Sequence, residues 1–127
     1  MIKAKECAIV TGLVFVVFGV LGFIPNPLVG PTGIFVTNTL HDLIHIISGV
    51  VLLAGAYSSL GSSMALKIVG VVYALVAILG FFAITDGSLF GLIPVNTADQ
   101  WLHVVLAVAI LIAGFALPDD EKGTMRA

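Results

Sequence analysis

Four long apolar stretches constrain this chain more than any other feature of its sequence. They occupy residues 7–24, 39–57, 65–85 and 98–117. Each is about 20 residues long, the length that an α-helix needs to cross roughly 30 Å of hydrocarbon. Only helices and closed barrels satisfy their backbone groups in lipid, and these stretches are too continuously apolar for barrel strands. The sequence therefore predicts an all-α integral membrane protein with four transmembrane helices.

The composition supports the same class. The chain has 127 residues, of which 60% are hydrophobic and only 9% are charged. Soluble domains carry about a quarter charged residues, so this chain has too few to cover a water-facing surface. We expect one transmembrane domain over residues 1–127, with short tails at 1–6 and 118–127. A transmembrane domain contacts the lipid bilayer. The sequence has no basic patch, which argues against nucleic acid as a partner.

The basic residues predict the orientation of the helices. The connections at 25–38 and 86–97 contain no Lys or Arg. All basic residues therefore fall on the opposite side of the four predicted helices: Lys3, Lys5, Lys67, Lys122 and Arg126. The positive-inside rule assigns that side to the cytoplasm. Both termini should then be cytoplasmic, with the two longer connections facing outward as ordered turns.

Two parts of the chain match when the sequence is shifted by 58 residues. The shift pairs Asn38-Thr39 with Asn96-Thr97 and His45 with His103, although the chain holds only three His and three Asn. We interpret residues of about 7–60 and 65–117 as two helical hairpins. Each hairpin has an even number of helices, so both should cross the membrane in the same orientation, related by a pseudo-two-fold axis along its normal.

Polar residues gather where the second and fourth predicted helices begin. Asn38 and Asn96 stand at favourable N-cap positions, and acidic residues in the following turn favour the helix dipole. One face of each helix also carries polar side chains, which should face the bundle interior because lipid-facing polar groups are costly. The expected cluster, in the outer half of the membrane, comprises His41, Asp42, His45, Asp99, Gln100 and His103.

Three interpretations of this cluster remain open. In the first, His45 and His103 hydrogen-bond to Asp42, Asp99 or Gln100 and only stabilise the bundle. In the second, the histidines bind a cofactor, either Zn²⁺ or a haem held between His45 and His103. In the third, the cluster handles protons or ions, because histidine titrates near neutral pH.

Other chemistries have little support in the sequence. We find no phosphate-binding loop, no nucleophile–base pair with recognisable spacing and no pair of cysteines, so we expect a protein that is not an enzyme. Tyr57 and Tyr73 are expected to pack near the cytoplasmic half. A homo-oligomer or a membrane-protein partner is compatible with the sequence, which identifies neither.

The histidine motifs resemble those of a known family. Asn38-x6-His45 is followed by Ile46-Ile47-Ser48-Gly49, and Asp99-x3-His103 precedes an apolar helix. This arrangement is similar to that of the four-helix membrane proteins called domain of unknown function 4383, over residues 7 to about 117. The resemblance implies a small integral protein of the bacterial cytoplasmic membrane. It implies no activity and no catalytic residues.

Overall fold

Four helices make up most of the molecule. The computed structural model describes residues 2–85 and 87–118, so Lys122 and Arg126 of the predicted cytoplasmic side lie outside the described residues. Each helix is long and apolar enough to cross a membrane, which confirms the prediction of four membrane-length helices. Within the described residues the helices are α1 (Ala4–Leu21), α2 (Thr39–Tyr57), α3 (Ser62–Phe82) and α4 (Thr97–Ala116).

Two helices differ from the prediction by three residues at both ends. The helices α1 and α3 both begin and end three residues earlier than the apolar stretches 7–24 and 65–85. At the start of α1, the Glu6 side chain accepts a hydrogen bond from the Lys3 N–H, at 2.9 Å. At its end, the Asn26 side chain donates to the Leu21 and Ile24 carbonyls and holds the chain in a turn ahead of Pro27. Hydropathy alone extended both helices into turns that are apolar but not helical.

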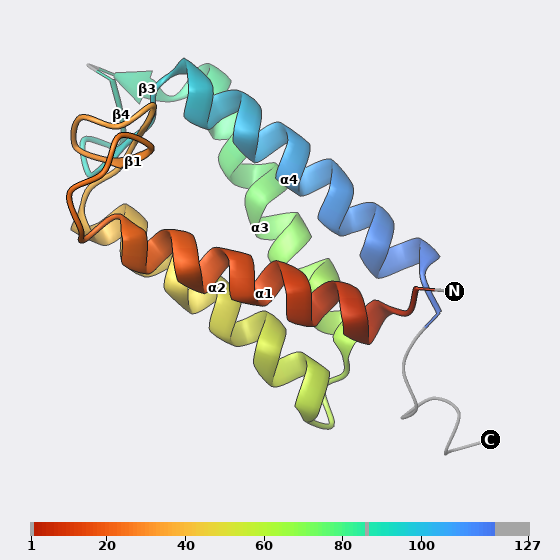
Figure 1. The fold of residues 1–127 in the computed structure, drawn as a ribbon. Helices are drawn as coiled ribbons and strands as arrows, with labels where there is room; N and C mark the ends of the chain where they lie inside the picture. Colours follow the sequence, from red (N-terminus) through yellow and green to blue (C-terminus); the bar gives the residue numbers. More distant parts are fainter. Residues whose placement is uncertain (1, 86, 119–127) are drawn as a thin grey trace.

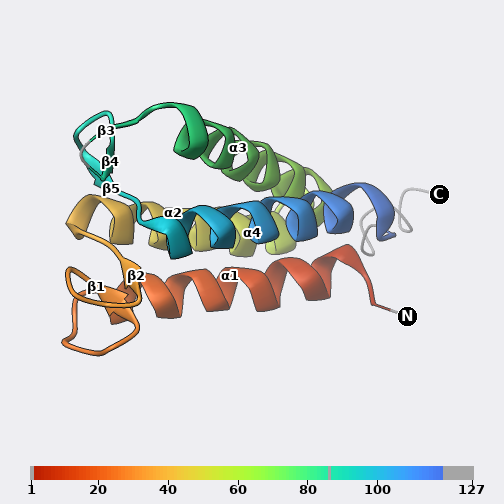
Figure 2. The ribbon, with the colours of Figure 1, turned by 90° about the horizontal axis from the view of Figure 1, so that it is seen from above.

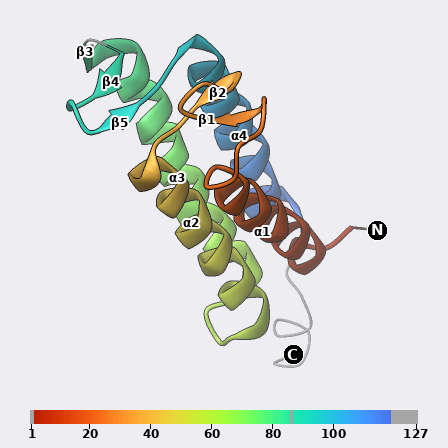
Figure 3. The ribbon, with the colours of Figure 1, turned by 60° about the vertical axis from the view of Figure 1, so that its left-hand side comes forward.

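The helices pack as two antiparallel hairpins, α1 with α2 and α3 with α4 (Figure 1), and these two pairs make the most extensive contacts. Between the hairpins, α2 lies beside α3 (Figure 3), and α1 also contacts α3 but touches α4 only slightly. Figure 2 shows the two strand-containing connections at one end of the bundle and the N-terminus and the end of α4 at the other. The Ala4 N–H donates to the Pro118 carbonyl at 2.9 Å, which joins the two chain ends.

Small residues allow the helices of the first hairpin to approach closely. A Cβ atom placed on Gly49 would lie 2.5 Å from the Gly12 carbonyl oxygen, and one placed on Gly12 would lie 2.9 Å from that of Gly49. At such distances the backbones of α1 and α2 are in direct contact. In membranes this kind of packing holds helices together because lipid gives no hydrophobic drive for their association.

The apolar side chains divide between a narrow core and an exposed outer surface. Leu52, Leu66 and Tyr73 are among the buried residues at the centre. Many large aliphatic and aromatic side chains on the helices remain exposed, among them Val17 and Ile78, with Phe115 exposed to 70%. A soluble protein rarely leaves so much contiguous apolar surface in water, and a bilayer solvates it.

The α1–α2 and α3–α4 connections, which lie at the same end of the bundle, contain short strands rather than turns alone. In the first, β1 (Val29–Gly30) pairs with β2 (Phe35–Val36) in parallel. In the second, β3 (Ile84–Thr85), β4 (Ser88–Leu89) and β5 (Ile93–Pro94) form an antiparallel sheet. These strands pair the backbone groups of both connections, which lie beside the helix starts that carry the polar residues.

Two asparagines link the hairpins, and each donates a hydrogen bond to the connection of the opposite hairpin. The Asn38 side chain accepts a hydrogen bond from the His41 N–H, and its amide donates to the Leu92 carbonyl at 2.9 Å. The Asn96 side chain accepts from the Asp99 N–H, and its amide donates to the Ile34 carbonyl at 2.8 Å. Each asparagine therefore caps its own helix and binds the connection of the other hairpin.

We expect Gly49→Ala to destabilise the protein by about 1–3 kcal/mol, the usual cost of overpacking, because the new Cβ meets backbone that cannot move aside. Gly80→Ala is the matched control. Its Cβ would lie 3.5 Å from the Gln100 Cγ, an ordinary contact, and alanine favours a helix by up to about 1 kcal/mol over glycine. Reversible unfolding in detergent measures both. Equal effects of the two substitutions would contradict the close packing of α1 on α2.

Candidate functional site

The helix α2 presents two histidines on one buried face. His41 and His45 are four residues apart, so their side chains lie one above the other along the helix. Their rings are edge-to-face with centroids 4.7 Å apart, and the two residues are only 3% and 8% exposed. Because Asn38 fixes the start of α2, it also fixes how far both imidazoles lie from the strand-containing end of the bundle.

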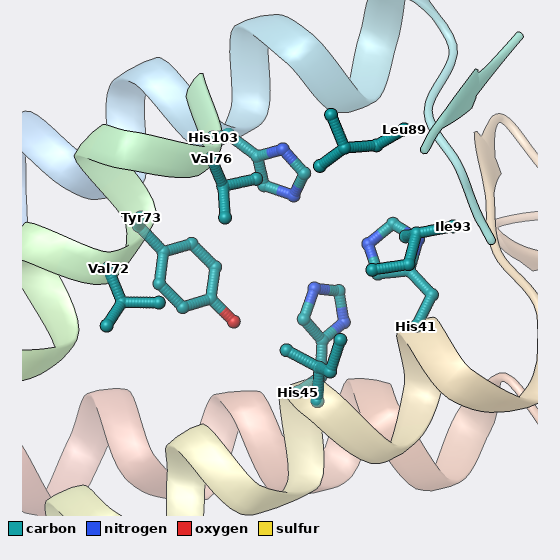
Figure 4. A pocket seen from close by; sticks show the side chains of 9 residues that line it. His41, His45, Val72, Tyr73, Val76, Leu89, Ile93 and His103 are labelled. Atoms are coloured by element: carbon teal, nitrogen blue, oxygen red, sulfur yellow. The ribbon is translucent and has the colours of Figure 1, made fainter. Parts of the chain in front are cut away.

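The third histidine comes from the other hairpin. His103 of α4 is 3% exposed, and its ring centroid is 5.7 Å from that of His41 and 6.5 Å from that of His45. One nitrogen of each of the three rings lies within 4.8 Å of the others. In Figure 4 the three imidazoles surround a common space. We call His41, His45 and His103 the histidine triad.

Hydrogen bonds leave the triad with free nitrogen atoms. The His41 Nδ1 lies 3.1 Å from the Pro94 carbonyl oxygen, and a carbonyl only accepts, so Nδ1 carries the proton. The other nitrogen, Nε2, then holds a lone pair when the ring is neutral. Among residues 2–85 and 87–118, neither nitrogen of His45 has a hydrogen-bond partner, and the buried Nδ1 of His103 has none either. The expected bonds from His45 to Asp42, Asp99 or Gln100 are therefore not formed.

Aromatic rings enclose the triad on the side away from the connections. The Phe15 ring lies 5.8 Å from that of His45, and the Tyr73 ring lies 5.8 Å from that of His103. The Ser48 hydroxyl donates to the Ile44 carbonyl, so the Tyr73 hydroxyl, 3.0 Å away, donates to Ser48. The sequence analysis expected only a packing role for Tyr73 and did not place its ring beside the histidine triad. The 58-residue shift could have indicated this position, because it pairs Phe15 with Tyr73.

A small cavity lies among these side chains. Its volume is about 40 Å³, and its wall includes the triad, Val72 and Val76 of α3, and Leu89 and Ile93 of the connection between α3 and α4. About 10–15 Å³ of such space holds one water molecule, so the cavity has room for an ion with one or two small ligands. A porphyrin is much larger, and the rings of His41 and Tyr73 occupy its place beside His45 and His103. The site does not fit a haem.

The acidic residues of the predicted cluster lie elsewhere. The Asp99 carboxylate accepts from the Asn96 N–H at 3.1 Å and completes the cap of α4. The Asp42 carboxylate packs against Gly22, the residue that follows α1, and Gln100 packs against Gly80 of α3. Within residues 2–85 and 87–118, the triad is the group of histidine, cysteine and acidic side chains with the spacing of metal ligands. The structure thus divides the predicted polar stripe into helix caps, interhelical contacts and a site made of imidazoles.

Three convergent imidazoles have a definite chemical capacity. Neutral imidazole is the commonest metal ligand among side chains and suits Zn, Cu, Fe and Ni. Three histidines with an open fourth position is also a donor set known for zinc. The Pro94 carbonyl would orient the His41 ring in the manner of the outer-shell partners of metal-bound histidines. The residues present therefore fit a single transition-metal ion.

The fold and the site together define a small four-helix membrane protein with a buried histidine triad. The chain belongs to the family described as domain of unknown function (DUF4383), whose model matches residues 5–116. That match confirms the family resemblance seen in the histidine motifs. No curated protein and no solved structure shows significant similarity to the chain.

We expect Tyr73→Phe to lower the free energy of unfolding by about 1 kcal/mol, because it removes the hydrogen bond to Ser48 and nothing else in the packing. Tyr57→Phe is the control, since the Tyr57 side chain is 71% exposed. Denaturation in detergent compares the two variants with the unaltered protein. A loss no larger for Tyr73→Phe than for Tyr57→Phe would show that the bond adds nothing to stability.

Proposed function

We propose that the protein is a non-enzymatic, metal-binding integral protein of the bacterial cytoplasmic membrane, with the histidine triad as its ligands. One observation carries the proposal: three buried imidazoles from two hairpins converge, and His45 has no hydrogen-bond partner on either nitrogen. Burying an unbonded polar group costs free energy, typically about 1–3 kcal/mol. A bound metal ion satisfies these nitrogen atoms at once.

The other interpretations of the triad have weaker support. A purely structural role would use the histidines as hydrogen-bonding links between helices, and His45 makes no such link. A proton or ion path would continue through polar groups, whereas the cavity wall on α3 is formed by Val72 and Val76 beside Tyr73. Metal binding accounts for both the convergence and the unpartnered atoms.

We also infer that the chain is a duplicated hairpin, with units of about 7–60 and 65–117 in the same orientation. The reciprocal bonds of Asn38 and Asn96 support this, because their acceptors, Ile34 and Leu92, are 58 residues apart, as the asparagines are. Further support comes from Gly22 facing Asp42 and Gly80 facing Gln100, again at the same spacing. A contact that recurs with exchanged partners is what a two-fold axis produces.

For the orientation, we propose that both chain termini are cytoplasmic and that the strand-containing connections face outward. The basic residues Lys3, Lys5 and Lys67 lie at the end of the bundle where Ala4 bonds to Pro118. The two connections at the opposite end, residues 25–38 and 86–97, contain no Lys or Arg. The distribution follows the positive-inside rule. The triad then lies nearer the outer surface.

The purified protein in detergent should bind one equivalent of a transition metal, tested with Zn²⁺ and, under anaerobic conditions, with Cu⁺. His45→Ala and His103→Ala should each weaken binding by more than about 100-fold, since loss of a ligand exceeds the 10–100-fold effect of losing an outer-shell partner. Competition with a chromophoric chelator measures the affinity, and Tyr57→Phe is the control.

Two results would contradict metal binding by the triad. One is that neither metal binds. The other is that affinity survives both histidine substitutions in variants that still elute as folded protein. A Soret band in the visible spectrum that disappears in His103→Ala would instead indicate haem.

The orientation can be tested with single cysteines in a Cys7→Ala background. Leu92 is exposed in the connection between α3 and α4, and Ser59 is exposed between α2 and α3. The two variants are Leu92→Cys and Ser59→Cys. A membrane-impermeant maleimide should label Leu92→Cys in intact cells and Ser59→Cys only after permeabilisation. The reverse pattern would show that the basic end faces outward.

A further inference from the structure

We propose that the histidine triad selects the monovalent ion Cu⁺ over divalent ions such as Zn²⁺. This inference rests on the proposed metal-binding function and adds the charge of the metal. It follows from the donor set: all three ligands are neutral imidazoles, and no carboxylate or thiolate of the described residues shares the group. The bound centre therefore keeps the full charge of its metal ion.

The charge matters because the site is buried. The three histidines are at most 8% exposed, and aliphatic and aromatic side chains surround them. The cost of placing an ion in a medium of low dielectric constant grows with the square of its charge, so a divalent ion pays about four times as much as a monovalent one. Neutral ligands do nothing to reduce this difference.

The neighbouring acids do not face the cavity. Asp99 caps α4 by accepting from the Asn96 N–H. Asp42 lies against Gly22, the residue that follows α1, so close that a Cβ atom there would overlap its carboxylate, and its buried Oδ1 has no hydrogen-bond partner among the described residues. Neither acid is among the residues that line the cavity. A divalent ion in the triad would have to take its compensating anion from solvent.

The coordination number leads to the same choice. Zn²⁺ in proteins is almost always tetrahedral, so after three histidines it needs a fourth ligand. The cavity wall offers only aliphatic groups and the neutral, protonated hydroxyl of Tyr73, so the fourth ligand would have to be a water or hydroxide taken into the cavity from solvent. Cu⁺ has a filled d shell, is stable with three donors and binds well to imidazole, so the triad alone completes its coordination.

The test compares two metals in the same protein. In detergent and without oxygen, Cu⁺ is titrated against bathocuproine disulfonate, and Zn²⁺ against a zinc-chelating dye. We expect the unaltered protein to bind one Cu⁺ at least 100-fold more tightly than Zn²⁺. Tighter binding of Zn²⁺ would overturn the preference for a monovalent ion while leaving the metal-binding function intact. Failure of both metals to bind would overturn the function and the preference together.

A charge introduced into the cavity wall gives an independent check. Val76 lines the cavity and is half-buried, and Val76→Asp would add one carboxylate beside the imidazoles. The ratio of Zn²⁺ to Cu⁺ affinity should rise at least tenfold in Val76→Asp and remain within threefold in Val76→Asn, which has the same size without the charge. Equal ratios in the two variants would overturn the charge argument. Val72→Asp and Val72→Asn repeat the comparison if either Val76 variant fails to fold.

Discussion

The need to satisfy polar groups where water is absent controls this structure. Backbone groups meet the requirement by forming helices, and the ends of the helices meet it through caps and short strands. Asn38 and Asn96 satisfy the first turns of α2 and α4, and Ser48 satisfies the hydroxyl of Tyr73. Against this background, His45 is unusual because it is the side chain of the described residues with two buried polar atoms that lack a hydrogen-bond partner. The metal-binding proposal begins from that contrast.

The site depends on the packing of the whole bundle. Direct contact of Gly12 with Gly49 brings α1 close to α2, and this places the Phe15 ring against His45. The connection between α3 and α4 covers the cavity at the strand-containing end of the bundle through Leu89, and it orients His41 through the Pro94 carbonyl. The environment of the imidazoles is thus set by apolar contacts and one backbone carbonyl. The neutral imidazoles therefore lie in apolar surroundings, which disfavour high charge.

Sequence predicted the helices and the region of the site better than the details of the site. Hydropathy located all four helices, although α1 and α3 ended early because their turns are as apolar as the helices. Helical spacing placed His41 and His45 on one face and the 58-residue shift added His103. The same spacing grouped Asp42 and Gln100 with them, but the tight packing of each hairpin directs these two side chains to Gly22 and Gly80. The contact of His41 with Pro94 depends on how a connection folds back, which periodicity does not encode.

The cross-bonds of the two asparagines bear on how the molecule is assembled. Chains are synthesised from the N-terminus, and domains form in that order. When α1 and α2 have paired, Asn38 still lacks its acceptor at Leu92, and His41 still lacks Pro94. Both partners, and His103 with them, belong to the second hairpin. The triad is consequently among the last features to form in biosynthesis, because it is complete only when α4 has joined the first hairpin.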